Sequence, residues 1–297
     1  MTAPLDVIII GGSYAGLSAA LQLARGRRRI LVIDAGERRN RFADSSHGFL
    51  TRDGDAPGTI AAIGRDQLLA YPTVTWLEGR ASQAERAGDD AFAITAGGAT
   101  HTARRVILAH GVADTLPEIP GIAERWGKTI FHCPYCHGYE LDRGPIAVLG
   151  NHAMSHHQAM LLPDWGPTTF FLEGHVLEPD IRAALLRREV TIEEGRVTSV
   201  GGAGRIEVHL ADGRTSSFAG MFLTPATRPS APLAAQLGCA SEDGPLGTFI
   251  TTDATKETST RGVFACGDIA LPMGSVAFAV ADGARAGFAT HASLIFR

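Results

Sequence analysis

The chain begins with a pattern of strand, turn, helix and strand. Residues 5–10 are an apolar, mostly β-branched run, which is typical of a buried parallel strand. A glycine-rich stretch at 11–16 follows directly, and apolar side chains then recur at helical spacing over 17–24. The next apolar run, 30–33, ends at Asp34. This order predicts the first unit of a nucleotide-binding domain.

A second unit of the same kind begins in the middle of the chain. Residues 146–149 are apolar and lead into Gly150, and a further strand at 170–172 ends at Glu173. The stretch 115–126 contains Leu-Pro and Pro-Gly steps without apolar periodicity, so we predict a linker there.

The last third of the chain contains further elements. Runs at 206–210 and 217–223 flank Asp212-Gly213 and predict a β-hairpin. Residues 263–265 predict a strand, and the small-residue stretch 275–296 predicts a helix.

Together these elements predict an α/β fold with two Rossmann-like, three-layer ββα nucleotide-binding domains, the second inserted in the first. We expect the first domain to comprise residues 1–114 and 244–297, and the second to comprise 115–243. A length of 297 residues agrees with two domains of about 150 residues each.

The net charge and the hydropathy of the chain exclude some classes of function. Arg and Lys number 27 against 31 Asp and Glu, and the net charge of −4 excludes a nucleic-acid binder that relies on bulk positive charge. No apolar run approaches the length of a membrane span, and no basic segment with a long apolar stretch begins the chain. We therefore expect a cytoplasmic protein that binds neither membrane nor nucleic acid.

The first glycine turn has the residues that a dinucleotide diphosphate requires. Gly11 and Gly16 occupy the first and third positions of the glycine motif, and Ser13 occupies the second. Backbone N–H groups at a helix start attract phosphate, and Asp34 is placed to accept from a ribose hydroxyl.

The second turn lacks these features. Residues 150–155 keep only the first glycine, and His152 stands where backbone should approach phosphate. Glu173 ends the next strand, where an NADP site has arginines. The sequence thus predicts that NADPH is a poor ligand.

Cys133-Pro134-Tyr135-Cys136-His137 is the strongest candidate for chemistry. Two residues between cysteines allow a disulfide that opens and closes reversibly, and His137 can take and return the proton of thiol exchange. For His132 we expect a packing or hydrogen-bonding role.

A zinc-finger spacing also matches formally, from Cys133 and Cys136 to His152 and His156. We interpret this match as chance and predict no metal site, because a buried strand and a glycine turn lie between the two pairs.

The strand at 263–265 runs into Gly267 and Asp268. Such a carboxylate can accept from a polyol such as a ribityl chain. A helix that starts near Ser275 directs its N-terminal dipole at a flavin carbonyl.

The segments 11–16, 119–121, 133–136 and 262–268 resemble the low-molecular-weight thioredoxin reductases, and the resemblance covers nearly the whole chain. It implies FAD in the domain made of both chain ends, an NADPH-type fold in the middle and a homodimer. It also implies that Cys136 faces the flavin and Cys133 exchanges with substrate. His137 replaces the aspartate that usually acts as the acid.

Other features depart from those reductases. His110 replaces a threonine, and Ser275-Val276 replaces an Arg-Gln pair near the flavin. Arg39-Asn40, the stretch 47–54 and the stretch 136–140 resemble a branch that includes the dithiol oxidases of gliotoxin and holomycin biosynthesis. In that branch a dithiol reduces the cysteine pair, which reduces FAD, which reduces oxygen to peroxide.

We therefore expect an FAD-dependent enzyme that oxidises a small-molecule or protein dithiol with molecular oxygen as final acceptor. The alternatives are an NADPH- or ferredoxin-dependent disulfide reductase and a non-catalytic redox-sensing flavoprotein. The expected catalytic residues are Cys133, Cys136 and His137. The expected FAD-binding residues are Gly11, Ser13, Tyr14, Ala15, Gly16, Asp34, Arg39, Asn40, His47, Gly267, Asp268, Ser275 and Val276.

Overall fold

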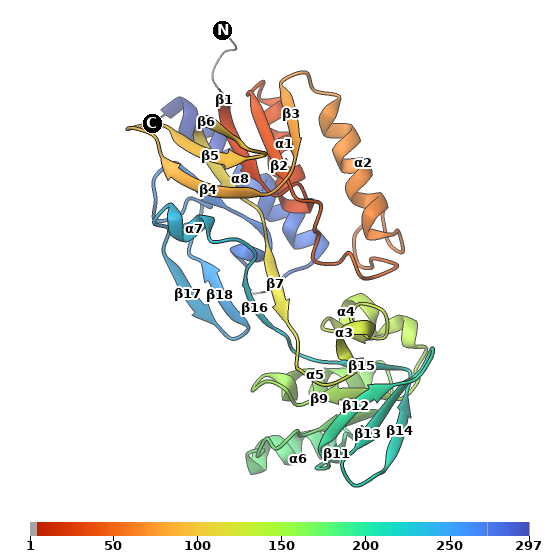
Figure 1. Cartoon of the computed structure of the whole chain (residues 1–297). Coiled ribbons are helices and arrows are strands. Elements are labelled where there is room, and N and C mark those ends of the chain that lie inside the picture. The colour runs from red at the N-terminus through yellow and green to blue at the C-terminus, as the bar shows by residue number, and fades with distance from the viewer. Residues whose placement is uncertain (1–4, 272, 297) are drawn as a thin grey trace.

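The computed structural model describes residues 5–271 and 273–296, which form two bodies joined by a pair of strands (Figure 1). In the first body, β1 (Leu5–Ile10) pairs in parallel with β2 (Ile30–Asp34) and with β6 (Ala99–Leu108). The helix α1 (Tyr14–Arg25) follows the glycine turn, as predicted. The other strands of this sheet are β3 (Val74–Glu78), β4 (Ala81–Arg86), β5 (Phe92–Ala96) and β19 (Val263–Ala265).

Both faces of β1 are covered from residue 7 onward, which explains why residues 7–10 are all apolar rather than alternating. Val7 and Ile9 pack with the helices α1, α2 (Pro57–Leu69) and α8 (Val276–Phe296). Ile8 and Ile10 pack on the opposite side with residues of β4 and β5. The first domain therefore has three layers: helices, a parallel sheet and an antiparallel β-layer.

The predicted small-residue helix is α8, and its small residues let it lie close to α1. A Cβ atom on Gly283 would collide with the carbonyl oxygen of Ala15, and one on Gly287 would collide with that of Ala19. This contact brings the start of α8 next to the start of α1.

The second body repeats the three layers. Its parallel sheet has the strand order β11-β10-β9-β15-β8, helices α5 and α6 pack with one face, and the antiparallel strands β12, β13 and β14 pack with the other. The sheet strands are β8 (Ile130–Phe131), β9 (Ile146–Leu149), β10 (Thr168–Phe171), β11 (Thr191–Glu193) and β15 (Gly220–Phe222). The remaining elements are α3 (Ile122–Arg125), α5 (Ser155–Leu161), α6 (Pro179–Arg187), β12 (Val197–Gly201), β13 (Ile206–Leu210) and β14 (Thr215–Phe218).

One sequence prediction is corrected here. The run 217–223 is not a single hairpin strand, because only β14 pairs with β13. After Phe218 the chain crosses to the parallel sheet, where β15 pairs with β9 and β8. A continuous apolar run therefore spans two strands in different layers.

The two bodies are joined by β7 (Val112–Thr115) and β16 (Ala226–Pro229), which pair antiparallel and run side by side between them (Figure 1). After β16, Leu233 and Leu237 pack into the core of the first domain. This packing favours a domain boundary at β16, earlier than residue 244, and we propose it there. The remaining elements of this region are α7 (Leu233–Gln236), β17 (Ser241–Gly244) and β18 (Gly247–Ile250).

In the described part of the chain, no helix combines the length and apolar character needed to span a bilayer.

Candidate active site

A cleft lies where the two bodies face each other. All predicted FAD-binding residues line it except Gly11, Gly16 and Asp34. Cys136 and His137 line it from the second body.

A smaller cavity is lined by Gly11 and Asp34. Glu37 and His110 border both cavities, so the two spaces are neighbours. A pair of adjoining cavities suits an extended ligand with two halves, such as a dinucleotide.

The glycine turn holds the start of α1 open toward these cavities. Gly11 has φ +104°, a conformation that favours glycine, and its carbonyl oxygen lies where a Cβ on residue 16 would stand. The N–H of Gly12 donates to Asp34 Oδ1 at 3.0 Å. Ser13 makes no side-chain hydrogen bond to the helix start, so the first N–H groups of α1 are available to an anion. Gly16 therefore acts through packing, whereas Ser13 lines the cleft.

The loop after β2 is fixed beside this turn. The Tyr14 hydroxyl donates to the carbonyl oxygen of Pro57 at 3.0 Å and accepts from Asn40 Nδ2 at 3.1 Å. Arg39 bridges two carboxylates, at 2.6 Å from Asp114 and 2.9 Å from Asp268. Burial alone would lower the pKa of Arg39, but these carboxylates raise it, so the guanidinium stays charged. Asp268, the predicted polyol acceptor, is therefore held in place by Arg39.

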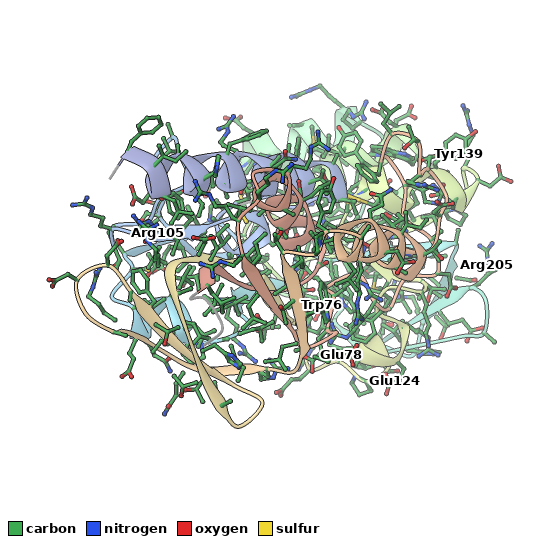
Figure 2. All side chains as sticks on the ribbon, turned by 90° about the horizontal axis from the view of Figure 1, so that it is seen from above. Trp76, Glu78, Arg105, Glu124, Tyr139 and Arg205 are labelled. Carbon is green, nitrogen blue, oxygen red and sulfur yellow. A yellow bond between two sulfur atoms is a disulfide. The ribbon has the colours of Figure 1, made fainter. Side chains whose placement is uncertain are left out.

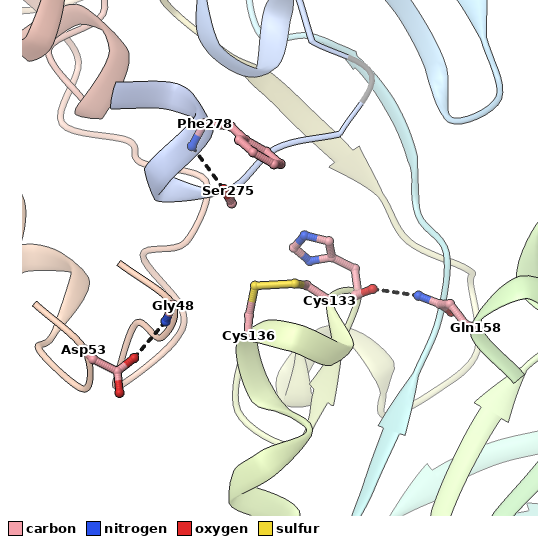
Figure 3. Close-up of a disulfide and its surroundings, with 8 residues drawn as sticks. Gly48, Asp53, Cys133, Cys136, Gln158, Ser275 and Phe278 are labelled. Atoms are coloured by element: carbon pink, nitrogen blue, oxygen red, sulfur yellow. Dashed lines mark hydrogen bonds between the residues drawn. A yellow bond between two sulfur atoms is a disulfide. The ribbon is translucent and has the colours of Figure 1, made fainter. Parts of the chain in front are cut away.

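Cys133 and Cys136 form a disulfide with a Cα–Cα distance of 5.3 Å, and the second cysteine belongs to the single turn α4 (Pro134–His137). Figure 3 places it opposite the start of α8, at Ser275, and the loop that carries Gly48 and Asp53. Cys136 lines the cleft, whereas Cys133 is not among the described residues that line it. The two sulfur atoms thus face different surroundings.

Aromatic side chains stand on the outer side of the disulfide. Tyr135 is 72% exposed and meets Trp165 edge-on, with 5.3 Å between ring centroids. Tyr139, in the short helical turn Tyr139–Leu141, projects at the periphery of the molecule (Figure 2). These exposed rings lie close in sequence to the cysteine pair.

Two neutral histidines flank the disulfide. His137 stacks on Phe131 with 4.4 Å between ring centroids. Burial, aided by the charge of His47, lowers the pKa of His137 to about 4. Burial also lowers the pKa of His132 to about 3, and His132 lines the cleft rather than only packing. Both rings are therefore in their proton-accepting form at neutral pH.

His47 connects the two bodies at the opening of the cleft. Its Nε2 lies 3.4 Å from Glu140 Oε1, and its Nδ1 lies 3.6 Å from Asp53 Oδ1. The loop at 44–55 is thereby held against the segment that follows the cysteine pair.

His110 has an orphaned polar atom. Ser230 Oγ lies 2.6 Å from the carbonyl oxygen of His110 and donates its proton there, so Nδ1 of His110 must donate to the same Oγ at 3.0 Å. This leaves Nε2 as an acceptor that is buried without a partner, and burial lowers the pKa of His110 to about 4. The ring borders both cavities, which is the arrangement expected when a bound molecule completes its surroundings.

The second glycine turn is filled by its own side chains. His152 Nδ1 accepts from the N–H of Met154 at 3.0 Å, and the N–H of His152 donates to Ser155 Oγ at 3.2 Å. Glu173 Oε1 accepts from the N–H of Val197 at 2.6 Å. Backbone N–H groups that a nucleotide would need are therefore already used.

The zinc alternative has no support in this geometry. The two cysteines are bonded to each other, and the described residues contain no group of three or more His, Cys, Asp or Glu that could hold a metal ion. The two other cysteines are free: Cys266 is buried in the core of the first domain, and Cys239 is half-buried against it.

Sequence reasoning did not find all the polar residues of the cleft. Arg38, Ser45 and Ser46 line it, and Asp114 and Glu140 hold residues that do. Arg38 stands beside the predicted Arg39-Asn40 pair, which was the available signal. Asp114 has no sequence signal, because its partner Arg39 is 75 positions away. Glu140 ends the stretch 136–140 noted above, but its pairing with His47 is not visible in the sequence.

Comparison with known proteins extends over both bodies. A family model described as pyridine nucleotide-disulphide oxidoreductase matches residues 5–285. The chain is 33% identical over 307 residues to thioredoxin reductase sirT of Leptosphaeria maculans, a match that covers 95% of this chain and 92% of that protein. The crystal structure of an oxidoreductase from Agrobacterium tumefaciens superimposes with a TM-score of 0.95 at 53% identity and covers 99% of each chain. The structure of HlmI gives 0.93 at 37% identity and covers 99% of this chain and 94% of that one.

Proposed function

Because the chain belongs to the pyridine nucleotide-disulphide oxidoreductase family, whose thioredoxin reductase relatives act on sulfur groups, we propose that it is an FAD-dependent dithiol oxidase. One observation carries the choice of oxidase over reductase. The turn at 150–155 is closed by His152, whereas the cleft of the first body reaches Cys136. This arrangement favours electron entry through the disulfide rather than from a pyridine nucleotide.

The residues of the cleft fit FAD. The family implies a flavin, the two adjoining cavities suit its two halves, and the unpartnered Nε2 of His110 lies at their junction. Ser13 and α1 would receive the diphosphate, Asp34 the ribose, and Asp268 the ribityl chain. Bound FAD would accept two electrons from the reduced cysteine pair and pass them to molecular oxygen, which gives hydrogen peroxide.

The thiol chemistry requires two exchanges. A substrate thiolate attacks Cys133 Sγ, which breaks the disulfide and releases the Cys136 thiolate toward the cleft. The second substrate thiolate attacks the substrate sulfur of the mixed disulfide, so the substrate leaves as a disulfide and Cys133 is released. Neutral His137 takes one of the two substrate thiol protons and the other goes to solvent; two protons are taken up again when oxygen is reduced to peroxide. The balance is one dithiol and one oxygen to one disulfide and one hydrogen peroxide.

The substrate would approach from the side of Tyr135 and Tyr139, whose exposed rings favour a dithiol with an apolar body. We further propose, on the family resemblance, a cytoplasmic homodimer. The exposed side chains Phe288 and Ile295 on α8 offer an apolar contact for a second copy.

The test is an anaerobic titration of the FAD-loaded protein with a small dithiol in one cuvette and NADPH in another, followed by flavin absorbance. We expect the dithiol to bleach the flavin, NADPH to leave it oxidised, and admitted air to restore the colour with one equivalent of peroxide. Cys136→Ser should abolish bleaching, whereas Cys239→Ser, at a half-buried free cysteine, should not.

Rapid bleaching by NADPH would instead establish a disulfide reductase. Bleaching by reduced ferredoxin alone would establish a ferredoxin-dependent disulfide reductase. Retention of FAD with no turnover by any of these would leave the redox-sensing alternative.

A further inference from the structure

The two arginines that line the cleft differ in their surroundings. Arg39 is neutralised between Asp114 and Asp268. Arg38 makes no ion pair with any carboxylate in the described part of the chain, and its Nε is buried without a hydrogen-bond partner. The cleft therefore holds one cation whose charge is already compensated and one whose charge is not.

Arg38 lies where two helices start. Its Nη2 is 3.5 Å from the position that a Cβ on Gly58 would take, in the first turn of α2. Its charge also acts on the hydroxyl of Tyr14, the first residue of α1, whose pKa is raised by burial and lowered by the Asn40 hydrogen bond and by Arg38. The bond from the Tyr14 hydroxyl to Pro57 ties the two helix starts together.

The two helix starts carry no negative side chain of their own. Neither α1 nor α2 has an acidic residue in its first turn, and neither has a side-chain cap. Each helix start acts as roughly half a positive charge. Together with the Arg38 guanidinium, these two helix starts present positive charge to a diphosphate.

We propose that Arg38 binds the diphosphate of FAD, and that Arg39 is a positioning residue that holds Asp268. This inference rests on the proposed FAD dependence. Arg38 follows Glu37, which borders both cavities, and Glu37 is itself paired with Arg80 at 2.7 Å. Arg38 itself lines the larger cleft together with Ser13 and Tyr14, at the start of α1 where the diphosphate would lie. Its planar fork can donate to two phosphate oxygens at once.

The experiment measures FAD affinity of the apoprotein by quenching of flavin fluorescence, at low and at high salt. The variants are Arg38→Gln, Arg38→Lys and, as a matched control in the same loop, Arg52→Gln, which pairs with Asp55 outside the cleft. We expect Arg38→Gln to weaken FAD binding about 10- to 100-fold at low salt. The difference should shrink at high salt, because ions screen the lost attraction.

Two further comparisons distinguish a lost contact with the diphosphate from a general distortion of the binding site. Binding of ADP should weaken in parallel with FAD, whereas binding of riboflavin, which lacks phosphate, should not change. Arg38→Lys keeps the charge but loses the fork, so we expect an intermediate affinity, and this variant serves if the glutamine variant does not fold.

Unchanged FAD affinity in Arg38→Gln, or a loss of the same size at both salt concentrations, would overturn the assignment. A wild-type protein that binds no FAD would overturn the proposed function instead, so the two failures are distinguishable.

Discussion

A buried ion pair between the loop before β19 and the helix α8 gives a quantitative test of the first domain. Lys256 Nζ lies 3.2 Å from Asp282 Oδ1, and their side chains are only 7% and 9% exposed. Asp282 Oδ2 also accepts from the N–H of Gly267 at 2.9 Å. The pair thus connects α8 to the turn that carries Asp268.

Lys256→Met removes the cation and leaves the carboxylate buried. Two unit charges at this separation attract by about 5 kcal/mol at an effective dielectric constant of about 20. Removing one member of a buried pair typically costs about 3–5 kcal/mol, since the other charge stays desolvated. We therefore expect the free energy of unfolding to fall by about 3–5 kcal/mol.

The assay is thermal and urea unfolding of the apoprotein by circular dichroism. At about 2–4 °C per kcal/mol the melting temperature should fall by roughly 6–20 °C. Lys256→Met combined with Asp282→Asn should recover much of the loss, because the amide oxygen still accepts from Gly267 and no charge remains buried. A loss below about 1 kcal/mol for the single variant, or costs that simply add in the double variant, would refute the reasoning.

Two other predictions concern the fold around the site. The folded-state pKa values of about 4, 3 and 4 for His110, His132 and His137 lie below the unfolded value of about 6.5, so only the unfolded chain takes up these protons as pH falls. Their stabilising effect is present above pH 6.5 and is lost as pH falls toward 4. The melting temperature should drop over this range, and His110→Thr should make the drop shallower; an unchanged slope would contradict the buried neutral ring. Gly283→Ala should lower the melting temperature and weaken FAD retention, because the new Cβ meets the Ala15 carbonyl oxygen and separates α8 from α1; a stability equal to that of Ala284→Ser would disprove this close contact.

The parallel sheets were predictable because local patterns determine them. Residues 5–10 and 146–149 are strands bounded by glycine turns, and the structure has them at these residues. The run 217–223 was predicted wrongly, because apolar residues that serve two layers look the same as those of one strand. Element type follows from local periodicity, whereas the assignment of a strand to a layer depends on distant partners.

The same limit applies to the cleft. Glycine turns, the cysteine pair and the Gly-Asp step carry local signals, and most residues predicted from them line one cavity. The state of each residue depends on pairs far apart in sequence. Arg39 pairs with Asp268, 229 positions away. Because this pair neutralises Arg39, Arg38 is the arginine of the cleft whose charge has no carboxylate partner among the described residues. No local pattern reports such a pairing.

The paired strands β7 and β16 also make the central body a separable module. The chain enters and leaves it through neighbouring strands, in register from Val112–Thr115 to Ala226–Pro229. Adjacent strands lie about 5 Å apart, a gap that a two-residue hairpin turn spans. The insertion therefore does not interrupt the sheet of the first domain. A cysteine-bearing body could be gained, exchanged or lost at this point while the sheet around β1 keeps all its strands.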